Sequence, residues 1–177
     1  MKTTAKKLML TFGIALSITT QAQENKISDV SGSDYNNAVG LRLGFTSGLT
    51  FKHKFGPGHA AEFIFSSGPY ALGVTGLYEK NIGTKITGLN CYLGAGAHFN
   101  MGGARRAIYR YYNDVRYTYV YGPGYNALGI DGVMGIEYKF KPIPFALSLD
   151  MKPFFEINNY GYGYFALDPS LGIKLAF

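Results

Sequence analysis

The residues with the clearest chemical potential are charges that recur in segments where apolar and polar residues alternate. Six bases and six acids occupy polar positions of these segments. Alternate residues of a strand lie on one face of a sheet, so a closed sheet would bring these charges together inside. A buried charge needs a partner, which predicts an internal salt-bridge network centred on Arg42, Asp131, Glu137, Asp150 and Lys152. The remaining members of the set are Lys52, Lys54, Lys139, Lys174, Glu62, Glu79 and Glu156.

Such a network has two possible roles. It can act as a structural plug that fills the interior, or as the gate of a narrow channel for ions or small solutes. Eight segments of the chain alternate in this way, and a sheet of eight strands that closes into a barrel is just wide enough to be filled by side chains. We therefore favour the plug and keep the channel as the alternative.

A second group of reactive side chains lies in the segment 100–126. Four arginines oppose a single acid, Asp114, and seven tyrosines interleave with them. Tyr and Arg are enriched at binding hot spots, and Arg matches phosphate and carboxylate groups. This predicts an extracellular binding loop for lipopolysaccharide, a glycan or a partner protein. The candidate contacts are Arg105, Arg106, Arg110, Arg116, Tyr111 and Tyr119. The alternative is a plain β-hairpin, and a surface location argues against nucleic acid.

Signals for an enzyme are weak. Nucleophilic catalysis needs a nucleophile with a base in hydrogen-bond reach, and no Ser follows His98 at the next position on the same face. His59 and Glu62 would lie on opposite faces of a strand, which argues against a metal pair. We therefore expect no catalytic residue, no metal and no cofactor. A lipid-modifying enzyme that depends on His98 remains the alternative.

Eight segments with period-two alternation must position these residues. Between them we expect short inner turns and longer outer loops, as in bacterial membrane barrels. A few residues break the pattern: His53 falls on the apolar face, whereas Ile64, Leu77 and Val133 fall on the polar one. The predicted strands are 39–45, 49–55, 61–65, 70–78, 89–99, 128–138, 145–151 and 171–177. The predicted outer loops are 47–48, 66–69, 100–126 and 158–169.

The content of the two faces favours a membrane. The polar face holds mainly Gly, Ala, Ser and Thr rather than the many charges of a water-exposed surface, and aromatic residues lie near the strand ends of the apolar face. Aromatic girdles of this kind flank the apolar band of membrane barrels. The sequence thus predicts an all-β, eight-stranded antiparallel up-and-down transmembrane β-barrel in contact with outer-membrane lipid. A soluble lipocalin-like barrel, with its apolar face inward, is the alternative.

The start of the chain predicts export. Residues 1–22 combine a basic start, a short apolar stretch and the small-x-small site Thr20-Gln21-Ala22, the layout of a secretory signal peptide. Their three lysines and absence of acids mean that cleavage lowers the formal net charge from +6 to +3. Residues 23–37 are expected to form a flexible periplasmic leader, and residues 38–177 the barrel. The single cysteine, Cys91, excludes an internal disulfide.

The end of the chain carries a resemblance. Leu171, Ile173, Leu175 and Phe177 alternate up to the last residue, which resembles the C-terminal insertion signal of outer-membrane barrels. Residues 39–177 are similar in pattern to the OmpX-like and OmpA-like group, and 144–153 resemble one strand of an outer-membrane barrel family of Bacteroidota. The resemblance implies location in the bacterial outer membrane and assembly by the barrel-assembly machinery. It implies no activity, so a role in envelope integrity or surface interaction is expected.

Overall fold

The computed structural model describes residues 35–177 except 57, 68–70, 103–105, 113–114 and 122–123. Their secondary structure is all β, as the alternating sequence predicts. The described residues form ten strands: β1 Asn37–Gly44, β2 Ser47–Lys54, β3 His59–Ser67, β4 Ala71–Gly83, β5 Leu89–Gly102, β6 Arg106–Tyr112, β7 Val115–Tyr121, β8 Asn126–Lys139, β9 Phe145–Asn158 and β10 Gly163–Ala176.

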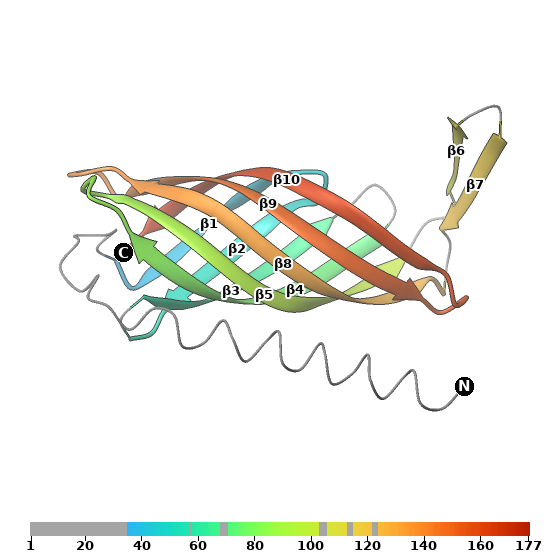
Figure 1. The fold of residues 1–177 in the computed structure, drawn as a ribbon, viewed down its shortest axis with the longest axis horizontal. Helices are drawn as coiled ribbons and strands as arrows, with labels where there is room; N and C mark the ends of the chain where they lie inside the picture. Colours follow the sequence, from blue (N-terminus) through green and yellow to red (C-terminus); the bar gives the residue numbers. More distant parts are fainter. Residues whose placement is uncertain (1–34, 57, 68–70, 103–105, 113–114, 122–123) are drawn as a thin grey trace, which may run out of the picture.

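Eight of these strands close into an antiparallel barrel in the order β1-β10-β9-β8-β5-β4-β3-β2 (Figure 1). Chain neighbours are barrel neighbours, and β1 closes the ring by pairing with β10. The predicted eight-stranded up-and-down barrel is therefore confirmed. Strands β6 and β7 pair only with each other, as a separate hairpin. We call the end that connects to this hairpin the hairpin end, and the end with the C-terminus the terminal end (Figure 1).

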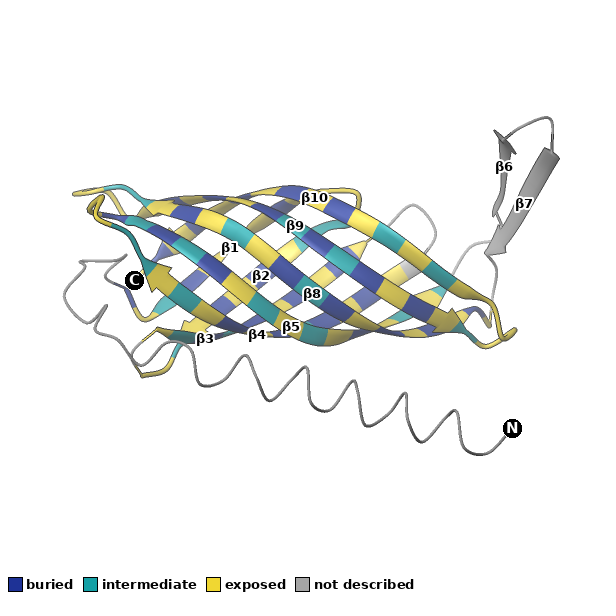
Figure 2. Ribbon diagram, in the orientation of Figure 1, coloured by how far each residue is buried: buried dark blue, intermediate teal, exposed yellow. Residues whose placement is uncertain are grey.

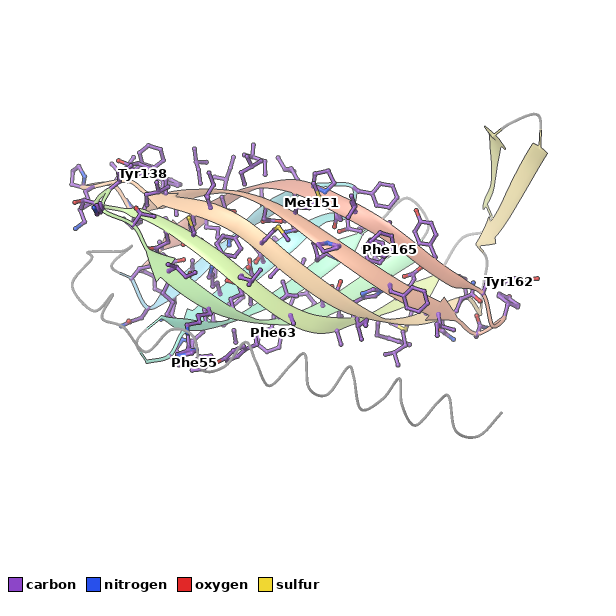
Figure 3. All side chains as sticks on the ribbon, viewed as in Figure 1. Phe55, Phe63, Tyr138, Met151, Tyr162 and Phe165 are labelled. Carbon is purple, nitrogen blue, oxygen red and sulfur yellow. The ribbon has the colours of Figure 1, made fainter. Side chains whose placement is uncertain are left out.

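Burial alternates along the barrel strands with the predicted period (Figure 2). In β9, for example, Leu147 and Leu149 are exposed, while Ser148 and Asp150, which alternate with them, are buried. The outward side chains are mainly apolar, and Phe63, Met151 and Phe165 are among them (Figure 3). The lipocalin-like alternative is wrong, because it requires the apolar face to point inward.

The barrel extends beyond its predicted limits at several places; β2 includes the predicted loop 47–48, and β9, predicted to end at residue 151, runs to Asn158. At its start, β1 includes Asn37, and Tyr35 is already buried, so the barrel begins before residue 38. At its end, β10 begins at Gly163, and the predicted loop 158–169 is mostly strand. The dipeptide Asp168-Pro169 is tolerated there because β1 pairs with β10 only up to Ser170.

The position of Pro169 follows from the direction of the backbone donors. The N–H of Phe177, directly after β10, donates to Asn37 of β1, and the N–H of Ala176, at the end of β10, donates to Pro144 next to β9. Donors of odd-numbered residues therefore face the β1 side. Pro169 has no N–H donor. It is the first odd-numbered residue of β10 beyond the stretch that pairs with β1, so the missing donor removes no hydrogen bond between the two strands.

Candidate functional site

The interior of the barrel collects the charges. All seven acids that the structure describes are buried there, together with four cations and one histidine. Because buried polar groups need partners, the pairing of these residues defines the chemistry of the lumen. The acids are Glu62, Glu79, Asp131, Glu137, Asp150, Glu156 and Asp168; the bases are Arg42, Lys52, Lys152, Lys174 and His98. They form two clusters.

The hairpin-end cluster starts at Arg42 of β1. One guanidinium nitrogen lies 2.6 Å from Asp150 Oδ1, and the other lies 3.6 Å from Asp168 Oδ2. Lys152 joins the next pair, with its Nζ 2.9 Å from Asp131 and 3.7 Å from Asp168. Asp168 also accepts hydrogen bonds from the backbone N–H and the hydroxyl of Thr46, which ties the β1–β2 turn to β10.

His98 continues this cluster toward the hairpin end. Its Nδ1 lies 2.8 Å from Asp131 Oδ2, and its Nε2 lies 3.1 Å from Glu156 Oε2. Asn100 and Tyr125 donate to the same Glu156 carboxylate at 2.9 and 3.0 Å. Both ring nitrogens are thus occupied by carboxylates, so this histidine acts as a bridge between two acids.

The terminal-end cluster is built around two lysines. Lys52 Nζ lies 2.6 Å from Glu79 and 3.6 Å from Glu137. Lys174 Nζ lies 2.9 Å from Glu62 and 3.4 Å from Glu137. Glu137 therefore lies within ion-pair distance of both lysines, while the closer contacts are those of Lys52 with Glu79 and of Lys174 with Glu62.

Two hydroxyl groups complete the terminal-end cluster. Thr50 donates to Glu62, and Tyr35, which precedes β1, donates to Glu137. Burial and the nearby Glu137 charge raise the pKa of Tyr35 above its ordinary value. The phenol therefore keeps its proton and remains a donor. In addition, Lys54 lies over the Tyr35 ring, with Nζ 3.8 Å from its centroid.

Tyr92 of β5 connects the two clusters. Its hydroxyl donates to Asp150 Oδ2 at 2.9 Å, and Lys52 Nζ lies 4.3 Å from its ring centroid. The ring packs with the buried side chains of Ile64, Leu77 and Val133. These three residues are the ones that break the predicted alternation, and they form an apolar layer inside the barrel. The lumen is therefore filled by ion pairs at both levels and by this layer between them.

The predicted network is only partly brought together. Arg42 pairs with Asp150, and Lys152 pairs with Asp131, within one cluster. Glu137 belongs to the other cluster, where its cations are Lys52 and Lys174. Lys139, expected in the lumen, donates instead to the backbone oxygens of Phe140 and Ile143 in the β8–β9 turn. Sequence reasoning missed Asp168 because Asp-Pro is a typical loop signal.

The predicted binding loop is seen only as backbone. Arg106, Arg110 and Tyr111 lie in β6, and Arg116 and Tyr119 lie in β7. The register places Tyr111 opposite Arg116. Arg105 lies outside the described residues. The hairpin is therefore observed, and its binding role stays a prediction.

The C-terminal pattern forms part of the outward apolar surface. Leu171, Ile173, Leu175 and Phe177 are all exposed, and the last residue lies next to β1. Their role as an insertion signal stays a prediction.

Comparisons with protein-family models, curated proteins and solved structures give no match to this chain. Within the part of the chain that the structure describes, no group of His, Cys, Asp and Glu side chains is arranged to hold a metal ion. No helix among the described residues is long and apolar enough to cross a membrane. The site thus has to be interpreted from its own geometry.

Proposed function

We propose that this chain is a closed, non-conducting barrel of the bacterial outer membrane that carries a binding hairpin on the cell surface. The observation that carries the proposal is the inverted distribution of side chains. The outside of the barrel is apolar between its two ends, and the described acids are all inside. A water-soluble barrel of this kind would leave a large apolar surface exposed, which monomeric soluble proteins rarely do.

The hairpin end is assigned to the outside of the cell. The connections at the terminal end are short, and the longest one, between β5 and β8, lies at the hairpin end. The other connections at the hairpin end are as short as those at the terminal end, so the assignment rests on this one long connection, which matches the longer extracellular loops of bacterial barrels. Export through a signal peptide of residues 1–22 is part of the same proposal.

The lumen acts as a plug in this proposal. A conducting path would need continuous water, but Tyr92, Ile64, Leu77 and Val133 pack together across the interior. The charges on both sides are paired at 2.6–3.7 Å. Opening such a pair costs several kcal/mol, about 3–5 when one partner is removed. In this proposal the paired interior specifies the strand register and closes the lumen to transport.

The contact with other molecules is assigned to the β6–β7 hairpin. Its sequence is rich in Arg and Tyr, and it is a sheet of its own beyond the barrel. Binding of an anionic surface group, such as the phosphates of lipopolysaccharide, suits the arginines. A structural or adhesive role in the envelope follows, with no reaction assigned to the lumen.

Ion conductance in a planar lipid bilayer tests the proposal. The chain without residues 1–22 is refolded, and a heat-dependent gel shift first verifies the closed barrel. We expect insertion without steady current. Steady, ion-selective steps would refute the plug and make the narrow channel the better reading. Failure to insert, despite a folded barrel, would refute the membrane location itself.

A further inference from the structure

The outer surface of the barrel carries basic side chains at its terminal end, and no Asp or Glu side chain of the described residues lies on it. Lys80, Lys85 and Lys141 are exposed there. The described acids are all buried in the lumen, so none of them neutralises these lysines on the outside. Among the described residues, the charged side chains that an external anion would meet on this surface are therefore cationic.

One small area of this surface lies on the apolar face itself. Among the outward positions of the eight barrel strands, His53, His59 and Lys80 are the only residues with a basic side chain. They lie on the adjacent strands β2, β3 and β4, all at the terminal end. Lys80 follows the buried Glu79, and its exposure places it on the outward face. The register pairs it directly with His59.

A tyrosine fixes one of these histidines. Tyr78 OH lies 2.6 Å from His59 Nδ1, and the two ring centroids are 5.7 Å apart. When the hydroxyl donates to Nδ1, the neutral imidazole carries its proton on Nε2. Nε2 is then a donor, on the residue that the register pairs with Lys80. Among the described residues, neither group has a carboxylate partner.

The surroundings of this pair are those of a lipid interface. Phe55 lies 6.0 Å from Tyr78, centroid to centroid, and Ala61 is the partner of Tyr78 in the register. The exposed Phe55 and Tyr138 mark the same end of the barrel (Figure 3). Aromatic side chains of this kind sit at the headgroup level of a bilayer. Lys80 is therefore at the depth where lipid phosphates lie and where a charge carries little cost.

We propose that Lys80 and His59 form a binding site for the phosphate of an anionic phospholipid in the leaflet at the terminal end. Lys80 Nζ and His59 Nε2 donate to the phosphate oxygens, Tyr78 holds the imidazole, and Phe55 contacts the start of the acyl chains. The inference rests on the proposed membrane location. To the proposed membrane location the inference adds a class of ligand, an anionic phospholipid, and the site that binds it.

Native mass spectrometry of the refolded chain tests the site. The protein is released from nanodiscs of phosphatidylcholine that contain a minority of phosphatidylglycerol, and the retained lipid is identified. We expect phosphatidylglycerol to be enriched over the disc composition. Lys80→Gln should reduce its retention by about fivefold, the effect typical of one basic residue near an anionic surface. His59→Gln should reduce it less. Lys85→Gln and Lys141→Gln are the matched controls and should retain the wild-type amount.

Three results would overturn the proposal. The first is equal retention of both lipids by the wild type. The second is an equal loss for Lys80→Gln and Lys85→Gln, because the surface would then act only through its overall charge. The third is binding of inorganic phosphate as tight as that of the phospholipid. Each variant is first checked by its heat-dependent gel shift and by insertion into vesicles. An inserted barrel without lipid preference rejects this site alone, whereas a folded barrel that does not insert rejects the membrane location.

Discussion

Removing the guanidinium of Arg42 tests whether the lumen is held together by its ion pairs. The Arg42 side chain is buried and lies 2.6 Å from Asp150, as the nearest cation to that carboxylate. Asp168, the second acid beside Arg42, does not depend on it alone, because Lys152 lies 3.7 Å away and Thr46 donates to it. In Arg42→Met, Asp150 retains only the neutral donors Tyr92 and Ser170. A buried carboxylate that loses its cation lowers the free energy of unfolding by about 3–5 kcal/mol. Because the two neutral donors remain, we expect a loss at the lower end of this range.

The measurement is urea unfolding in lipid vesicles. The chain has no tryptophan, so unfolding is followed by circular dichroism and by the gel shift. The double variant Arg42→Met/Asp150→Asn removes both charges and should recover most of the loss, since an apolar or neutral replacement of a buried pair is often nearly neutral. Lys85→Met, at an exposed turn, should stay within about 0.5 kcal/mol. A loss below about 1 kcal/mol for Arg42→Met, or additive losses in the double variant, would refute the reasoning.

Three further perturbations address the exterior, the packing and the hairpin. Leu149→Arg changes an exposed outward side chain and should cost about 2–4 kcal/mol in vesicles if that position is near mid-bilayer; a neutral effect on unfolding would contradict the membrane location. Gly135→Ala would place a Cβ 2.6 Å from both Tyr92 Cζ and Asp150 Cβ and should cost about 1–3 kcal/mol, measured in the same assay; an unchanged midpoint would contradict the tight filling of the lumen. Replacing residues 104–122 by a short Gly-Ser linker should change barrel stability by no more than about 0.5 kcal/mol, because β6 and β7 pair only with each other. The same replacement should abolish binding to lipopolysaccharide in a pull-down. Retained binding would place the binding site elsewhere.

The alternation of the sequence was sufficient to predict that the eight barrel strands exist and which faces they have, but not the full length of β9 and β10. Each side chain of a strand points to one of only two sides, so Leu147, Ser148 and Leu149 could be assigned from their spacing alone. The same logic gave the number of barrel strands and the hairpin between β5 and β8.

The partners within the lumen could not be predicted in the same way. They depend on the register and on the stagger with which β1 meets β10, which no local pattern encodes. Glu137 and Asp131 lie on the same face of β8, yet Glu137 meets Lys52 and Lys174, and Asp131 meets Lys152. Asp168 was hidden by its loop-like dipeptide. Ile64, Leu77 and Val133 look like errors in the sequence pattern until the closed barrel brings them around Tyr92.

The long sequence separation of the lumen contacts has a consequence for how the chain reaches its native state. Arg42 and Asp150 are 108 residues apart, and Tyr35 and Glu137 are 102 apart. Arg42 reaches this partner only when β1 meets β10, whose other neighbour β9 carries Asp150. Until β1 and β10 pair, the Arg42 guanidinium must stay hydrated. Ring closure and the loss of water from these charges are therefore expected to occur in one late kinetic step, slow because its contacts are so distant in sequence.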